Sequence, residues 1–87
     1  MQYKIFFTHK AEKQYNTLTR HNPKLKKQFD QAITDLEQWQ GNILKLTDLH
    51  NNYRLRVNNY RLIFSLESDT IYILEINDRK EAYKKGR

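Results

Sequence analysis

The chain has 87 residues, a length that allows one domain with a single modest hydrophobic core. Its 16 Lys and Arg outnumber its 10 Asp and Glu, and the formal charge of +6 favours nucleic acid, an acidic protein or an anionic membrane surface as partner. The lack of cysteine excludes disulfides and thiolate chemistry, and no apolar run forms a signal segment or reaches the roughly 18 residues of a membrane span. We therefore expect a cytoplasmic protein with a single domain over residues 1–87.

The N-terminal region predicts a strand followed by a helix. Residues 1–7 alternate between apolar and other side chains, as a half-buried strand does. Thr8 is a suitable N-cap for a helix over residues 9–18, which would be marginal alone and needs a sheet beneath it. The apolar positions are Tyr3, Ile5 and Phe7 in the strand and Ala11, Tyr15 and Leu18 in the helix.

A second helix is predicted from Asn22 as N-cap and Pro23 as the first helical residue to about Gln40, with Gly41 as the residue that ends it. Its apolar stripe consists of Leu25, Phe29, Ala32, Ile33 and Leu36. The following connector, residues 42–52, carries aliphatic side chains that either pack beneath the helix end or begin an edge strand. These side chains are Ile43, Leu44, Leu46 and Leu49.

Lysines near the start of the second helix lie off its apolar stripe. They are Lys24, Lys26 and Lys27. One interpretation is a solvated basic turn. The alternative is a secondary nucleic-acid contact, with Lys26 and Lys27 as RNA-binding residues. Cations near a helix N-terminus are unfavourably placed relative to the helix dipole, which favours some use for them.

Residues 53–64 predict a β-hairpin, because two runs of strand-forming residues flank the dipeptide Asn58-Asn59. A two-residue loop that matches the twist of a sheet requires positive φ at both loop residues, which Asn tolerates best after Gly. Such a loop fixes the register. The expected pairs are Val57 with Tyr60, Arg56 with Arg61, Leu55 with Leu62, Arg54 with Ile63, and Tyr53 with Phe64.

Side chains alternate across a strand, so this register gives the hairpin an apolar face and a basic face. The apolar face belongs to the core, and the basic face carries Arg54, Arg56 and Arg61. Like charges opposed across strands are destabilising by a few tenths up to about 1 kcal/mol. The basic face is either a solvated surface or a site for a polyanion, most plausibly phosphodiesters, which arginine binds through two parallel hydrogen bonds.

Residues 70–76 predict a further strand that is apolar on both faces and therefore central in the sheet. The tail that follows has five basic residues and one acidic residue from Arg79 onward. The order strand, helix, helix, strand, strand, strand predicts an α+β fold, with both helices on one face of a small, twisted, mainly antiparallel sheet. The opposite face, which bears the arginines, is expected to stay open or to be shielded only by the tail.

The sequence resembles the RelE branch of the RelE/ParE superfamily, whose members are toxins of type II toxin–antitoxin pairs. The segments that carry this resemblance are Tyr53-Arg-Leu-Arg-Val57, Tyr60-Arg-Leu-Ile-Phe64, Ile71-Tyr-Ile-Leu74 and Asp78-Arg-Lys-Glu-Ala-Tyr83. The resemblance implies that the protein enters the ribosomal A site and cuts mRNA. In that metal-free reaction the 2′-OH attacks the adjacent phosphate and leaves a 2′,3′-cyclic phosphate and a 5′-OH. ParE-type toxins instead poison DNA gyrase.

By the same resemblance, Arg61 and Arg79 contact the scissile phosphate and Tyr83 lies near the reacting 2′-OH. Arg54 and Arg56 stand where the best-known branch has two lysines. Arginine is essentially never deprotonated, so neither can be a general base, but both can stabilise charge or hold RNA. We expect Arg56, Arg61, Arg79 and Tyr83 to be catalytic. The expected RNA-binding residues are Arg54, Lys26, Lys27, Lys80, Lys84 and Lys85.

Tyr83 is the only neutral acid–base candidate near these arginines, and its ordinary pKa of about 10 would be lowered by them. The alternative is that its ring only packs the tail onto the sheet. Glu81 is the expected charge partner of Arg79. The three histidines, His9, His21 and His50, lack ligand spacing, so we expect neither a metal site nor a cofactor. Tyr3, Tyr15, Tyr72 and Trp39 are expected to serve packing rather than base stacking.

Alternative functions stay open: a gyrase poison of the ParE kind without nuclease activity, or a basic RNA- or protein-binding module without catalysis. Under either toxin interpretation the expected partner is a cognate antitoxin, acidic and partly disordered when free, that folds onto the basic face. The ribosome and mRNA are the other expected partners, and a membrane is not.

Overall fold

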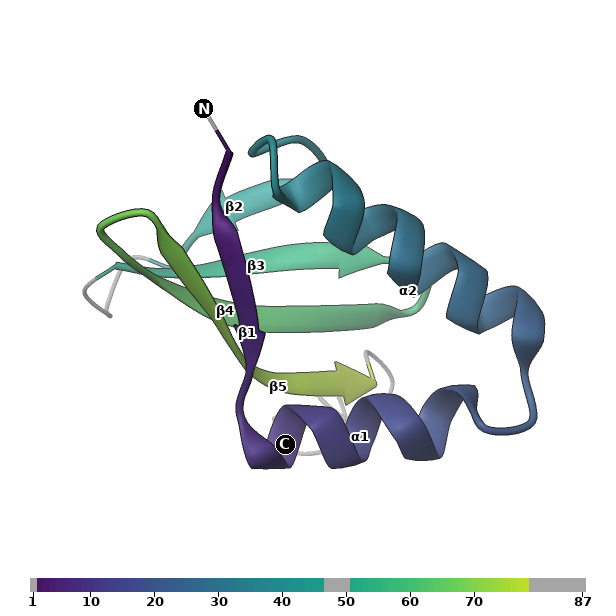
Figure 1. Ribbon diagram of the computed structural model, residues 1–87. Helices are drawn as coiled ribbons and strands as arrows, with labels where there is room; N and C mark the ends of the chain where they lie inside the picture. The colour runs from purple at the N-terminus through teal and green to yellow at the C-terminus, as the bar shows by residue number, and fades with distance from the viewer. Residues whose placement is uncertain (1, 47–50, 79–87) are drawn as a thin grey trace, which may run out of the picture.

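The computed structural model describes residues 2–46 and 51–78. Two helices follow the first strand, and four further strands follow the helices (Figure 1). The elements are β1 (Lys4–Phe7), α1 (His9–Thr19), α2 (Pro23–Leu36), β2 (Ile43–Lys45), β3 (Asn52–Val57), β4 (Tyr60–Glu67) and β5 (Thr70–Asp78). The expected α+β class is confirmed, and β2 adds one strand to the expected order.

The strands form one sheet in the order β1-β5-β4-β3-β2. Strand β1 runs parallel to β5, and the other neighbouring pairs are antiparallel, so the expectation of a mainly antiparallel sheet is confirmed. Strand β5 is central, between β1 and β4, as its apolar sequence predicted. Strand β2 pairs with β3 through Ile43 and Leu55, which decides the interpretation of the connector in favour of an edge strand. Leu49 lies outside the described residues.

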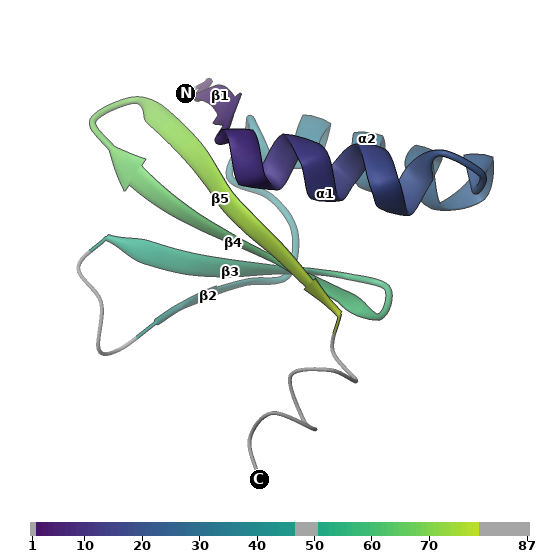
Figure 2. The same ribbon diagram turned by 90° about the horizontal axis from the view of Figure 1, so that it is seen from below.

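Both helices lie on the same side of the sheet (Figure 2). Their apolar stripes meet the apolar face of the hairpin in one cluster of buried side chains. Its members are Ala11, Leu25, Phe29, Leu36, Leu55, Val57, Leu62, Phe64, Ile71, Ile73 and Ile76. Within the described ranges, neither helix is long and apolar enough to cross a membrane.

The hairpin has the register that the sequence predicted, in all five pairs from Val57–Tyr60 to Tyr53–Phe64. Asn58 has a φ of 56°, whereas its neighbour Asn59 does not adopt positive φ. The expectation of positive φ at both loop residues was therefore wrong for Asn59.

Helix α2 ends at Leu36 rather than near Gln40, and Gly41 is not its C-terminal cap. The chain leaves the helix through a turn in which Trp39 adopts a φ of 56°, in the left-handed region. This turn brings the Trp39 ring against Tyr53, with ring centroids 5.0 Å apart, and against Phe64 at 5.8 Å. Aromatic packing on the sheet offsets a backbone conformation that costs a non-glycine residue about 1 kcal/mol or more.

The N-terminus of helix α1 is hydrogen-bonded to β5 directly after Phe7, the last residue of β1 that pairs with β5. Thr8 is the N-cap that the sequence predicted, because its Oγ1 accepts a hydrogen bond from the Ala11 N–H at 3.2 Å. The same hydroxyl donates to the carbonyl oxygen of Leu74 at 2.9 Å. Leu74 lies at an irregularity between β4 and β5, where Phe64 pairs with Ile73 but Ile63 pairs with Glu75. This β-bulge shifts which residues face the core along β5.

Candidate nucleic-acid interface

The sheet face opposite the helices, which we call the open face, is not covered by any element in the described part of the chain (Figure 2). The strand registers arrange its side chains in rows that run across the sheet. The first row is Arg56, Arg61 and Asn77. The second is Leu44, Arg54, Ile63 and Glu75. The third is Asn52, Ser65, Tyr72 and Phe6. The structure thus brings Arg54, Arg56 and Arg61 together on one side of β3 and β4, as the sequence predicted.

Arg56 and Arg61 are opposed at close range. The Arg56 N–H donates to the Asn42 carbonyl oxygen at 3.1 Å, on the side away from β4. In an antiparallel pair this makes Arg56 and Arg61 a non-hydrogen-bonded pair, whose α-carbons approach to about 4.5 Å. Arg56 is exposed and Arg61 half-buried, and no ion pair involving either is found among the described residues. Two like charges at this spacing favour a bound anion between them.

Arg54 lies one row further along β3, and its register neighbours are the aliphatic Leu44 and Ile63. Its Nε is buried, and no hydrogen-bond acceptor for it is found among the described residues. A buried donor without an acceptor costs about 1–3 kcal/mol, more for a charged group.

The C-terminal tail begins beside the first row. Asn77 pairs with Arg61 and Asp78 pairs with Tyr60, so β5 ends next to the arginine pair. Residues 79–87 lie outside the described ranges. The predictions for Arg79, Lys80, Tyr83, Lys84 and Lys85, and that for Glu81, therefore stay predictions.

Lys26 and Lys27 belong to α2 and thus lie on the helix side of the molecule, away from the open face. The Lys26 ammonium is 2.9 Å from the Asp30 carboxylate. The hydrogen-bonded ion pair with Asp30 raises the pKa of Lys26. Because α2 lies on the helix side, any contact of Lys26 or Lys27 with RNA would use a surface separate from that of the arginines.

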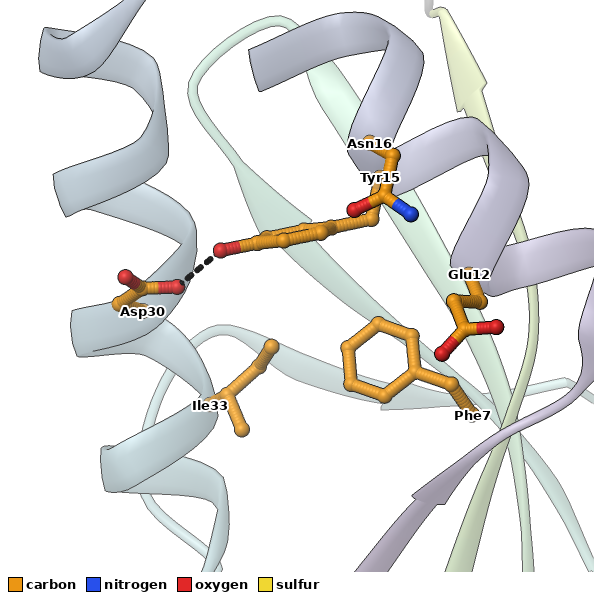
Figure 3. Close-up of a pocket in the computed structure, with 6 residues that line it drawn as sticks. All are labelled: Phe7, Glu12, Tyr15, Asn16, Asp30 and Ile33. Atoms are coloured by element: carbon orange, nitrogen blue, oxygen red, sulfur yellow. Dashed lines mark hydrogen bonds between the residues drawn. The ribbon is translucent and has the colours of Figure 1, made fainter. Parts of the chain in front are cut away.

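The helices enclose a groove of about 340 Å³ lined by Phe7, Glu12, Tyr15, Asn16, Asp30 and Ile33 (Figure 3). Tyr15 donates its hydroxyl hydrogen to Asp30 Oδ1 at 2.5 Å across this groove. Burial and the adjacent carboxylate raise the pKa of Tyr15, and the hydrogen bonds from Tyr15 and Lys26 lower the pKa of Asp30. A tyrosine held protonated in this way joins the helices rather than serving as a base.

The lowered pKa of Asp30 predicts a pH-dependent contribution to stability. Because the folded-state pKa lies below the unfolded value of about 3.9, the contribution is present above about pH 4 and is lost as the pH falls through the folded pKa. We expect Asp30→Asn to lower the free energy of unfolding by less than about 1 kcal/mol near neutral pH, since this pair is solvent-exposed, and by much less near pH 2.

Urea unfolding at the two pH values measures this difference. Asp35→Asn is the matched control on the same helix, because the Asp35 carboxylate accepts a hydrogen bond from the neutral Gln31 amide at 3.0 Å. An equal loss for Asp30→Asn at both pH values would show that the carboxylate charge is not the cause.

Two aromatic side chains lie on the open face, of which Phe6 agrees with the alternation of residues 1–7 and Tyr72 was expected to serve packing. Phe6 and Tyr72 are register partners on β1 and β5, with ring centroids 6.1 Å apart. Tyr72 packs against Phe6, as the expectation of a packing role requires, but 36% of its surface stays exposed and it does not belong to the buried core. The sequence signal was Phe6 on the mixed face of β1 and the apolar character of both faces of β5. Trp39, Tyr3 and Tyr15 pack as expected.

Within the described ranges, no three His, Asp or Glu side chains are grouped so that they could hold a metal ion. His9 is the first residue of α1, and His21 lies in the turn after that helix. Both side chains are exposed. His50 lies outside the described residues.

Comparison with known proteins adds a family and a set of similar folds. Residues 5–83 match the sequence model of a family described as the ParE toxin of type II toxin–antitoxin system, parDE. No curated protein matches the chain. Among solved structures, a chain of the RelB–RelE antitoxin–toxin complex from Methanococcus jannaschii is 25% identical, with a TM-score of 0.72 over 94% of this chain and 99% of that chain.

Two further structures share the fold at lower identity. A chain of the archaeal RelE–RelB complex from Pyrococcus horikoshii OT3 is 23% identical, with a TM-score of 0.73 over 91% of this chain and 97% of that chain. A chain of the DinJ–YafQ toxin–antitoxin complex from E. coli is 13% identical, with a TM-score of 0.73 over 95% of this chain and 99% of that chain.

Proposed function

Because the chain belongs to the ParE toxin family of type II toxin–antitoxin systems, within the RelE/ParE superfamily, we propose that it is a toxin that cuts mRNA on the ribosome and so inhibits translation. Membership of the superfamily was expected from the sequence and is confirmed. The proposal of mRNA cleavage is supported by the resemblance of the hairpin and tail to RelE-type toxins, and by the RelB–RelE complex among the similar solved structures.

The proposed reaction is a transfer within the RNA that needs no metal ion. The ribose 2′-oxygen loses its proton and forms a bond to the adjacent phosphorus, while the bond from phosphorus to the 5′-oxygen of the next nucleotide breaks. That oxygen takes up a proton. The products are a 2′,3′-cyclic phosphate and a 5′-OH. The protein must stabilise the extra negative charge on the phosphate and move protons at the two oxygens.

Each proposed residue has one of these tasks. Arg56, Arg61 and Arg79 stabilise the phosphate charge, and Tyr83 is the acid–base candidate. The residues proposed to hold the RNA are Arg54, Lys26, Lys27, Lys80, Lys84 and Lys85. The single observation that carries the proposal is the close opposition of Arg56 and Arg61 on the open face, which no described element covers (Figure 2). This arrangement costs stability and favours a bound phosphate.

Induction of the gene in a growing cell tests the proposed activity. We expect translation to stop and primer extension on a reporter mRNA to find new 5′ ends within the reading frame, in phase with its codons. Intact mRNA together with arrested growth would contradict the proposal.

Tyr83→Phe tests the acid–base assignment. Loss of the phenol O–H is expected to lower the rate of mRNA cleavage by about 100-fold or more, since a positioned acid or base contributes that much. Single-turnover cleavage on programmed ribosomes measures this rate. Tyr72→Phe is the matched control, because Tyr72 lies on the open face but has no proposed role in proton transfer. An undiminished rate in Tyr83→Phe would leave the ring with a packing role only.

A second candidate function is the poisoning of DNA gyrase, which is favoured by the description of the matched family as ParE. It predicts an SOS response and trapped DNA breaks upon induction, with mRNA intact. The same induction experiment therefore separates the two candidates.

We also propose a cognate antitoxin as partner. Several similar solved structures are toxin–antitoxin complexes, RelB–RelE and DinJ–YafQ among them. The net charge of +6 favours an acidic partner, and a disordered acidic segment that folds upon binding could cover the open face. An adjacent short reading frame that encodes an acidic protein, and co-purification of its product, would support this partner.

A further inference from the structure

Phe6 and Tyr72 form an exposed aromatic pair on the open face. Phe6 is 54% exposed and Tyr72 is 36% exposed, which makes them unusual among the large apolar side chains that the structure describes. Their ring planes are 25° apart, so the pair is stacked rather than edge-on. Each ring buries one flank against the other and leaves apolar surface in water. A flat partner that covers this surface would gain the free energy of its burial.

The aromatic pair lies on the same face as the arginines but on other strands, since Tyr72 is on β5 and Phe6 on β1 whereas Arg61 is on β4. Tyr72 is the register neighbour of Ser65, and Ser65 lies on the same side of β4 as Arg61, four residues away. At about 3.3 Å per residue, the two rows are roughly 13 Å apart. Neighbouring strands lie about 4.8 Å apart and stacked nucleotides advance about 3.4 Å each, so the pair lies about four to five stacked nucleotides from a phosphate bound at Arg61.

The charges around the pair are mixed, because the exposed Glu67 lies in the row that also holds Thr70 and Lys4. Glu75 lies in the row between the arginine pair and the aromatic pair, and its carboxylate is 2.8 Å from the Lys10 ammonium. Its negative charge is thereby compensated. Lys4 is exposed and lies two residues before Phe6 on the same face of β1, so it places a cation beside the rings. Exposed aromatic rings with basic side chains on the same surface, here Lys4 beside the rings and the arginines further along the face, are the combination by which proteins bind single-stranded nucleic acid.

From this arrangement we infer that Phe6 and Tyr72 are a base-stacking platform that binds a nucleotide of single-stranded RNA a few positions from the phosphate at Arg61. The inference rests on the proposed function, because the same RNA spans both places. It assigns Phe6 and Tyr72 to substrate binding and gives them no part in the chemical step.

Binding of a short fluorescent single-stranded RNA to the purified protein tests the platform by anisotropy. The variant is Phe6→Leu with Tyr72→Leu, which keeps apolar side chains but removes both rings. A base stacked on an aromatic ring contributes about 1–3 kcal/mol, so we expect the variant to bind about 5- to 150-fold more weakly. For an abasic oligonucleotide of the same length and charge, wild type and variant should bind equally.

Ring-retaining variants supply the control. Phe6→Tyr and Tyr72→Phe should bind the RNA within about twofold of wild type, because every base stacks on either ring. Thermal unfolding should be alike in all variants, since both side chains are exposed. Equal weakening on normal and abasic RNA would overturn the inference, as would full RNA affinity in the double variant. Full RNA affinity with lost antitoxin binding would instead identify the face as a protein interface.

Cleavage kinetics separate this role from that of the arginines. The double leucine variant should raise KM for programmed ribosomes about 5- to 150-fold with kcat unchanged, because a remote contact binds ground state and transition state alike. A fall in kcat at unchanged KM would overturn the inference. If the wild-type protein cuts no mRNA, the proposed function fails, but base-dependent binding of free RNA still decides the role of the rings.

Discussion

Arg61→Gln is expected to slow mRNA cleavage by at least about 100-fold and at the same time to make the fold more stable. Arg61 is opposed to Arg56 across the hairpin, so loss of one charge relieves their repulsion and should raise the free energy of unfolding by a few tenths up to about 1 kcal/mol. The same change removes a charged donor from the phosphate in the transition state, which should lower the cleavage rate by about 100- to 1000-fold. Urea unfolding and single-turnover cleavage measure the two effects.

Arg20→Gln is the matched control, because Arg20 is an exposed arginine at the C-terminal end of α1, on the helix side. Its cleavage rate should equal that of wild type, with a change in stability within about 0.5 kcal/mol. Arg56→Gln should stabilise as Arg61→Gln does, and the double variant should gain less than the sum, since either change removes the same repulsion. A joint loss of stability and activity in Arg61→Gln would indicate a structural role.

Phe64→Ala is expected to have the largest effect on stability. Phe64 is fully buried, and its ring lies 5.4 Å from that of Tyr53 and 5.8 Å from that of Trp39. Truncation of a buried phenylalanine costs about 3–5 kcal/mol, through lost burial and the cavity left behind. Domains of this kind have only about 5–15 kcal/mol in total, so a large fraction of the variant could be unfolded at moderate temperature. Urea unfolding measures the loss.

Phe6→Ala provides the comparison, because it removes the same side chain from an exposed position on the opposite face. We expect it to cost less than about 1 kcal/mol. Similar losses for the two variants would mean that Phe64 does not lie at the centre of the core.

The hairpin could be predicted residue by residue because a two-residue loop fixes the register and a buried face resists a shift of one residue. The C-terminal end of α2 could not be predicted from the sequence. Its apolar periodicity continues past Leu36, and only the contacts of Trp39 with rings distant in sequence decide where the helix stops. The β-bulge at Leu74 could not be predicted either, because a run of apolar residues does not indicate which residue is left out of the strand pairing.

For the candidate site, alternation along β3 and β4 was enough to predict that Arg54, Arg56 and Arg61 share a face. The contact between Phe6 and Tyr72 could not be predicted from the sequence, because it depends on the parallel pairing of β1 with β5. No local pattern encodes which distant strand a short N-terminal strand will join. Arg79 and Tyr83 were assigned through the family resemblance, and their roles stay predictions.

A structure of the protein on a ribosome, with an mRNA that is 2′-O-methylated at the codon to be cut, would test the central proposal most directly. The methyl group blocks the attacking oxygen and preserves the complex. We expect a phosphate of that codon within about 2.7–2.9 Å of guanidinium nitrogens of Arg56 and Arg61, on the open face. RNA bound along α2 at Lys26 and Lys27, with the arginines facing no phosphate, would contradict it.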